Sequence, residues 1–63
     1  MKESELVAIL ATMEIPANNR DISNTRNLFW LIRNLRIQNA NHPKIEETID
    51  ELKGMARLTI LRN

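Results

Sequence analysis

The sequence predicts an all-α domain of three helices. Three observations lead to this fold class: apolar residues recur at helical spacing, the chain has only one Gly and two Pro, and two short polar stretches interrupt the apolar pattern. Few Gly and Pro leave few turns, so most of the chain is available for helices. We expect helices at about residues 4–14, 22–38 and 43–61, within a single domain that spans residues 1–63.

The small size of the chain predicts self-association. Folding of 63 residues would bury only about 60% of the surface that the unfolded chain exposes, which makes a monomer marginally stable. The sequence has no Cys for disulfides and a single His, too few for a typical structural zinc site. We therefore expect a homodimer. The acidic start, residues 1–5, does not suit a signal peptide, and no apolar run approaches the roughly 18 residues that cross a bilayer. These features predict a cytoplasmic protein with no membrane partner.

The first helix is expected to begin at Ser4, whose hydroxyl can accept a hydrogen bond from an unpaired amide of the first turn. Pro16 disfavours the helical conformation at Ile15 and should stop the helix near residue 14. The apolar stripe between these limits consists of Leu6, Ile9, Leu10 and Met13.

The second helix is the centre of the predicted fold. Residues 16–20 are typical of a loop, and Asp21 or Ser23 can cap the helix that follows. On a helical wheel, Trp30 falls roughly opposite the main stripe, so this helix is apolar on two faces. The second face needs cover, either from the first helix or from a second chain. The main stripe consists of Leu28, Leu31, Ile32 and Leu35.

The third helix is expected to start at Pro43, because proline's missing amide hydrogen costs nothing at the first helical position. Gly54 is compatible with the interior of a helix or with its end. We expect the helix to continue to about residue 61, which would direct Leu58 and Leu61 away from the main stripe. That stripe consists of Ile45, Ile49, Leu52 and Ala56.

The outer face of the second helix is the predicted protein interface. Trp and Arg are enriched where proteins meet, and this face places the one Trp of the chain beside Arg33. We assign the interface to Phe29, Trp30, Arg33 and Ile37. The predicted function is therefore a non-enzymatic protein-interaction module that contacts its mate or another protein.

A small nucleic-acid-binding regulator is the alternative function. Its binding residues would be Arg26, Arg33 and Arg36, because cations beside an aromatic ring can contact phosphates and bases. The net charge of only +1 and the acidic start of the third helix oppose this alternative. The acids either pair with these arginines or complement the helix dipole. They are Glu46, Glu47, Asp50 and Glu51.

The sequence predicts no catalytic, cofactor or metal site. A nucleophilic site needs a base, and the only candidate, His42, stands before Pro43, where we expect a helix cap or a surface residue. A single Gly excludes a Gly-rich phosphate loop, and the carboxylates lack the spacing of a calcium-binding loop. We therefore expect that the protein is not an enzyme.

One stretch of the sequence resembles a group of known proteins. Residues 26–53 contain a W-L-x-R-N-L pattern at Trp30–Leu35 and an N-x-x-H-P pattern at Asn39–Pro43. In these patterns the chain resembles small uncharacterised proteins encoded by bacteriophages and prophages. The resemblance implies a regulatory protein or one directed at a host protein, and it brings no binding residues with it.

Overall fold

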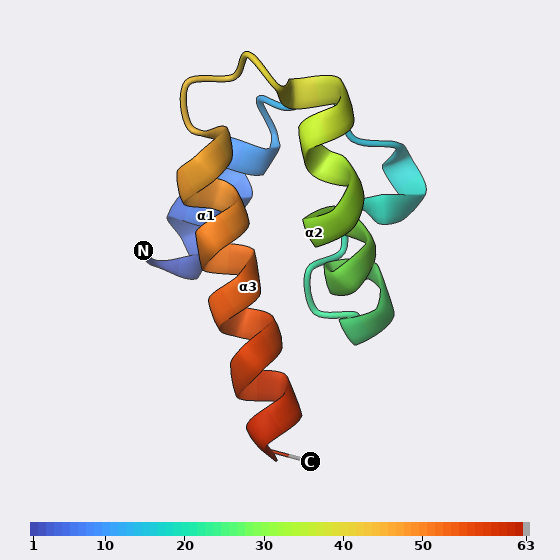
Figure 1. The fold of residues 1–63 in the computed structure, drawn as a ribbon, viewed down its shortest axis with the longest axis vertical. Helices are drawn as coiled ribbons and strands as arrows, with labels where there is room; N and C mark the ends of the chain where they lie inside the picture. The colour runs from blue at the N-terminus through green and yellow to red at the C-terminus, as the bar shows by residue number, and fades with distance from the viewer. Residues whose placement is uncertain (63) are drawn as a thin grey trace.

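The computed structural model describes residues 1–62 and has the predicted all-α architecture of three helices (Figure 1). A short 3₁₀ helix, η1, lies between the first two, and the described residues contain no strand. The elements in chain order are α1 (Glu3–Leu10), η1 (Ala17–Asn19), α2 (Thr25–Asn39) and α3 (Ile45–Arg62).

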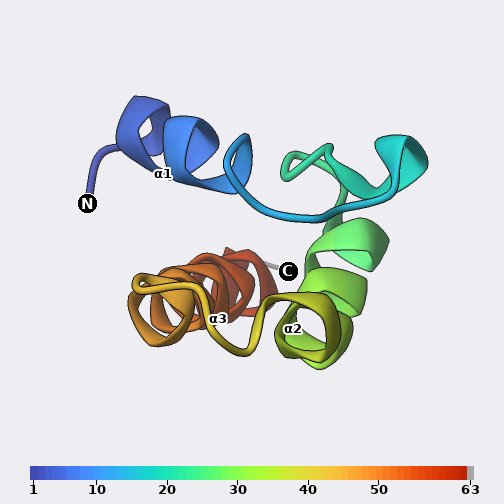
Figure 2. The same cartoon turned by 90° about the horizontal axis from the view of Figure 1, so that it is seen from above.

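The helices form two layers. α2 and α3 lie side by side and antiparallel, and α1 lies with the following segment in a second layer across them (Figures 1 and 2). α1 packs against α3, and η1 packs against α2. The prediction that the second helix is central needs one correction, because α3 is the helix that packs against both α1 and α2.

The core lies where the two layers meet. Leu31 of α2 and Leu52 of α3 have no exposed surface at all. The predicted stripes are confirmed with small changes, since Ile9 and Ile32 are only partly buried while Ile15 and Ile22 join the core from outside the helices. The remaining core residues are Leu6, Leu10, Met13, Leu28, Leu35, Ile45, Ile49 and Ala56.

The first helix is shorter than predicted, and Ser4 is not its cap. Lys2 is the N-cap, without a side-chain hydrogen bond, and the helix ends at Leu10. Beyond that residue the backbone continues in tighter turns, because the Thr12 amide donates to the Ile9 carbonyl at 2.9 Å. The Thr12 hydroxyl donates to the same carbonyl at 2.6 Å. The helix therefore ends well before Pro16 can affect it.

The second helix starts later than predicted, and its cap is Asn24. The Asn24 side chain accepts a hydrogen bond from the Asn27 amide at 3.0 Å. Asp21 instead closes the preceding turn, where its carboxylate accepts hydrogen bonds from the Ser23 hydroxyl at 2.6 Å and amide at 2.9 Å. These two bonds, the side-chain bond above all, stabilise the charged form and lower the pKa of Asp21 below its ordinary 3.8.

The third helix begins two residues after Pro43. The first α-helical hydrogen bond joins the Thr48 amide to the Lys44 carbonyl at 3.0 Å, and Pro43 lies in the turn before it. His42 is not the cap of this helix, because α3 begins three residues later; instead its Nδ1 accepts a hydrogen bond from the Lys44 amide at 3.0 Å and closes the turn before the helix. Its Nε2 lies 2.8 Å from the Thr12 hydroxyl. His42 thus joins the start of α3 to the end of α1.

Gly54 lies inside α3, which resolves its ambiguity in favour of the helix interior. A Cβ added at this position would have no atom within 4 Å outside the local helix. Gly54→Ala should therefore raise the free energy of unfolding by about 0.5–1 kcal/mol, because alanine lowers the entropy of the unfolded chain and brings no clash. Urea denaturation followed by circular dichroism measures the change, and an unaltered or lower midpoint would contradict the expectation.

Candidate protein-interaction surface

Two buried asparagines fix the segment that runs over α2. Asn39, at the end of α2, pairs with the backbone of Glu14: its side-chain amide donates to the Glu14 carbonyl at 3.0 Å, and its carbonyl accepts from the Glu14 amide at 2.8 Å. The same amide group donates to the Leu35 carbonyl at 2.9 Å. One side chain thereby satisfies three backbone groups and holds residue 14 against α2.

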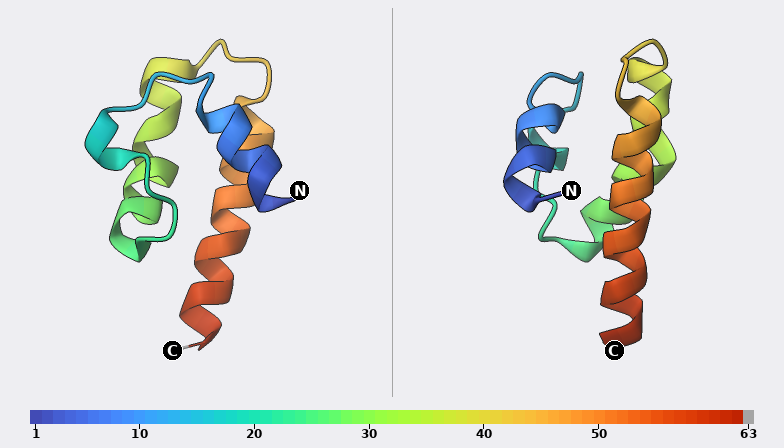
Figure 3. Two further views of the ribbon diagram at one scale, coloured as in Figure 1. Left: turned by 180° about the vertical axis from the view of Figure 1, so that it is seen from behind. Right: turned by 90° about the vertical axis from the view of Figure 1, so that its left-hand side faces the viewer.

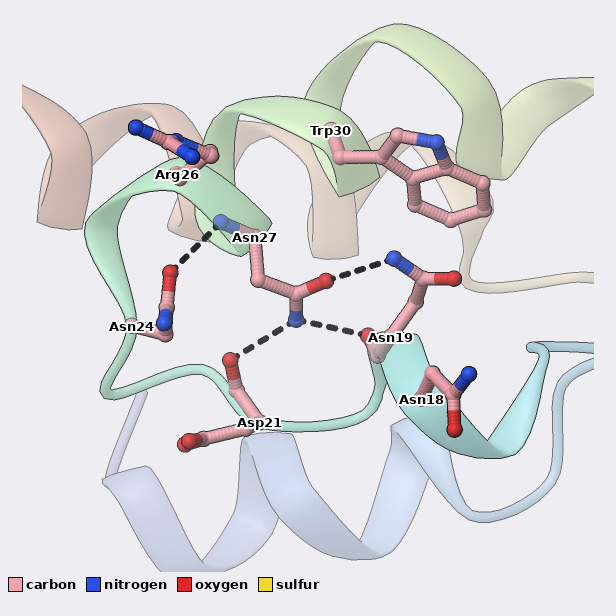
Figure 4. Close-up of a pocket in the computed structure, with 7 residues that line it drawn as sticks. All are labelled: Asn18, Asn19, Asp21, Asn24, Arg26, Asn27 and Trp30. Carbon is pink, nitrogen blue, oxygen red and sulfur yellow. Dashed lines mark hydrogen bonds between the residues drawn. The ribbon is translucent and has the colours of Figure 1, made fainter.

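Asn27 does the same near the start of α2 (Figure 4). Its amide donates to the carbonyls of Asn19 and Asp21, both at 2.7 Å, and its side-chain oxygen accepts from the Asn19 amide group at 2.9 Å. The sequence pattern places Asn27 inside the second helix and Asn39 in the loop after it, and neither structural role is apparent from the pattern. Asparagine is usually exposed in proteins. The structural roles of these two side chains therefore become apparent only from their burial in the folded chain.

The 3₁₀ segment, rather than α1, supplies the intramolecular cover of Trp30. Pro16, Asn18 and Asn19 line hollows beside this side chain, and the indole lies over the Asn19 end of η1 (Figure 4). The idea that the first helix covers Trp30 is wrong, since α1 packs against α3. Trp30 packs against the core yet stays partly exposed. It is therefore both a core residue and a surface residue.

The four residues of the predicted interface lie along one side of α2, which we call the outer face of α2. Phe29 and Trp30 are partly buried, Arg33 is exposed, and Ile37 is 70% exposed. Phe29, Trp30 and Arg33 line one open hollow of about 550 Å³. Trp30 and Ile37 line a second hollow of about 240 Å³. Trp30 thus lines both hollows. The outer face of α2 therefore presents apolar side chains around open space.

The three arginines of the alternative site do not act together. Arg26 and Arg33 line the larger hollow of the outer face. Arg36 instead forms a two-point ion pair with Glu46 at the start of α3, at 2.7 and 3.1 Å. Both side chains are well exposed, so the pair contributes about 0–1 kcal/mol to stability. Of the two explanations that the sequence left open for these acids, pairing with an arginine of the second helix holds for Glu46.

A third hollow, the α2–α3 groove, was not assigned from the sequence. It lies between α2 and the last turns of α3, which extend past the start of α2 (Figures 1 and 3). Its volume is about 340 Å³. The signal that could have located it is the apolar end of α3, where Leu58, Ile60 and Leu61 are 59%, 59% and 75% exposed. The groove is lined by Phe29, Ile32, Lys53, Ala56, Arg57, Ile60 and Leu61.

Two features of the described chain bear on the kind of site. Across residues 1–62, no three side chains of His, Cys, Asp or Glu gather in a group that could hold a metal ion. No helix in that range has both the length and the apolar character needed to cross a membrane.

Comparison with known proteins adds no relative. The chain matches no family model, no curated protein and no solved structure.

Proposed function

We propose that the chain is a non-enzymatic protein-interaction module and that the outer face of α2 is its contact surface. The observation that carries this proposal is an isoleucine, Ile37, left 70% exposed on the same hollow as the partly exposed Trp30. Large apolar side chains gathered on one hollowed face are typical of a surface that another protein covers.

The composition of the face supports a protein partner. Aromatic residues and Arg are enriched in interface cores, and this face combines Phe29, Trp30 and Arg33. Trp30 and Phe29 are held by packing against the core, so little side-chain entropy remains to be lost on binding. The expected homodimer remains a prediction, as does the cytoplasmic location. The resemblance to phage proteins, which rests on sequence pattern alone, would make a bacterial host protein the other candidate partner.

Two measurements on the full chain test the proposal. The first is the mass in solution by light scattering over a wide range of concentration, for the natural chain and for Ile37→Glu. The second is covalent capture inside cells, with a photoreactive amino acid placed at position 37. The matched control position for both is Val7 on α1, which is 50% exposed and lies off this face.

The expected result is association that depends on position 37 and not on position 7. A mass that doubles with concentration and returns to that of a monomer in Ile37→Glu identifies a second copy as the partner. A cross-linked protein found from position 37 but not from position 7 identifies a foreign one. A strictly monomeric chain that captures nothing at position 37 would remove the proposal.

A nucleic-acid-binding regulator is the second candidate function. The observation that favours it is that Arg26 and Arg33 line the same hollow as Phe29 and Trp30. Binding to duplex DNA should then be measurable at low salt and should weaken steeply as salt is added, because phosphate contacts release counterions. Absence of binding at low salt, or binding that salt does not alter, would remove this candidate.

A further inference from the structure

We infer that the α2–α3 groove receives an acidic amphipathic helix of a partner protein, with the apolar side of that helix on the groove and its carboxylates against the basic rim. The inference rests on the proposed function, since it names the chemistry of the partner and extends the contact surface from the outer face of α2 onto α3. Phe29 belongs to both surfaces and joins them.

The floor of the groove is apolar and lacks cover. Ile32 and Ala56 form its inner part and pack with the core. Ile60 and Leu61 form its outer part on the last turns of α3, where they are 59% and 75% exposed. A helix end that projects beyond its neighbours has little packing to stop it from fraying. Apolar cover at this end would bury these side chains and hold the last turns in the helix.

The charged side chains that line the groove, among the described residues, are both positive. Lys53 and Arg57 line it from α3. Beyond Phe29, Arg26 and Arg33 line the adjoining hollow on α2. Within residues 1–62, no carboxylate side chain lines either hollow. A partner with acidic residues beside an apolar ridge therefore finds opposite charge along both sides, which steers its approach and fixes its orientation.

A second copy of the chain fits the groove poorly. A symmetric dimer would place this face against itself and bring like charges together. The chain's own acidic segment at the start of α3 does not supply the required ridge either. Its carboxylates surround Ile45, Ile49 and Leu52, which are buried in the core and cannot enter another molecule.

Nucleic acid also fits the groove less well than a helix. Apart from Phe29, the apolar residues that line the groove are aliphatic, whereas bases stack on aromatic faces and phosphates gain nothing from aliphatic side chains. Docking of an amphipathic helix in an apolar groove uses the aliphatic floor and the basic rim together.

The test uses two matched peptides and the full chain. Each peptide is about 16 residues long, roughly four helical turns, with leucines spaced to form one apolar stripe. One peptide has Glu beside the stripe and the other has Lys at the same positions. Neither contains Trp, so emission from Trp30 and fluorescence anisotropy of a labelled peptide both report binding. A duplex DNA and the concentration dependence of the mass are measured in parallel.

Two pairs of variants separate the groove from general effects. Lys53→Glu with Arg57→Glu reverses the rim, and Arg20→Glu with Lys44→Glu makes the same change of net charge at exposed positions outside the groove. Ile60→Ser removes an apolar side chain that lines the groove. Leu58→Ser removes one of equal exposure, 59%, that does not line it. Far-UV circular dichroism checks that every variant is folded.

The acidic peptide should bind at least about tenfold more tightly than the lysine peptide, with the difference shrinking as salt screens the charges. The rim reversal should remove that preference or invert it, and Ile60→Ser should weaken binding about tenfold, while the two control variants keep the affinity of the natural chain. Equal binding of both peptides, no binding of the acidic peptide, or equal losses in the controls would overturn the inference.

Other outcomes assign the groove to a different occupant. DNA binding that depends on Lys53 and Arg57, without peptide binding, would replace the inference with a nucleic-acid site. A dimer abolished by the rim reversal would replace it with a second copy. If the peptide fails while capture or association at Ile37 persists, only the groove inference fails. If both fail, the proposed function fails with it.

Discussion

Replacing Leu52 with alanine should destabilise the protein more than any other single truncation in α3. Leu52 has no exposed surface and lies where α3 meets the rest of the core. A Leu→Ala change at such a site costs about 2–5 kcal/mol, through lost burial and the cavity left behind. A chain of this size has a total free energy of unfolding of about 3–9 kcal/mol. A large fraction of the variant should therefore be unfolded near 37 °C.

The matched control is Leu58→Ala in the same helix. Leu58 is 59% exposed, so its truncation should change the free energy of unfolding of the monomer by less than about 0.5 kcal/mol. Chemical denaturation at low protein concentration compares the two variants. Similar losses at both positions would mean that α3 does not pack through the Leu52 side.

Replacing Asn39 with alanine should have the second largest effect. The change removes three hydrogen bonds and leaves the Glu14 amide and carbonyl without their protein partners. We expect a loss of about 2–3 kcal/mol in the free energy of unfolding, because unpaired polar groups near the core cost more than the bonds themselves contribute. Urea denaturation measures the loss.

Two further substitutions show how Asn39 acts. Asn39→Asp keeps the acceptor for the Glu14 amide but removes both donors, so at neutral pH it should be at least as destabilising as alanine. Asn41→Ala, an exposed asparagine two residues away, should change stability by less than about 0.5 kcal/mol. Equal effects at positions 39 and 41 would show that the paired bonds to Glu14 do not hold the layers together.

The helices were predictable because each follows from a local rule that tertiary packing did not override. The stripe containing Leu28, Leu31 and Leu35 is buried as its spacing predicts. The helix starts were less predictable, because several polar residues near each start could act as the cap. Ser4, Asp21 and Ser23 were plausible caps, yet the backbone begins its helices after Lys2 and Asn24. The choice depends on where the preceding turn closes.

The candidate site was predictable only in part. The helical wheel correctly placed Trp30 and Ile37 on the side of the second helix away from the main stripe, because this placement follows from the helical repeat alone. The cover over Trp30 could not be predicted, since it depends on Asn27 and Asn39 binding backbone groups 6 to 25 residues away. The α2–α3 groove also depends on two helices meeting, and one sequence does not give their relative position.

The two-layer arrangement has a consequence for the order of folding. α2 and α3 are neighbours in the chain and pack as an antiparallel pair, so their contacts can begin beside the short loop that joins them and form early. α1 docks on α3 only after a larger loop has closed, since α1 ends at Leu10 and α3 begins at Ile45. Core residues between α2 and α3 should then control how fast the chain folds, while Asn39 mainly controls how fast it unfolds. The layer of α1 and η1 is the part expected to open first in the native state. Such an opening would expose the face of α2 and α3 that this layer covers, while α2 and α3 stay packed against each other.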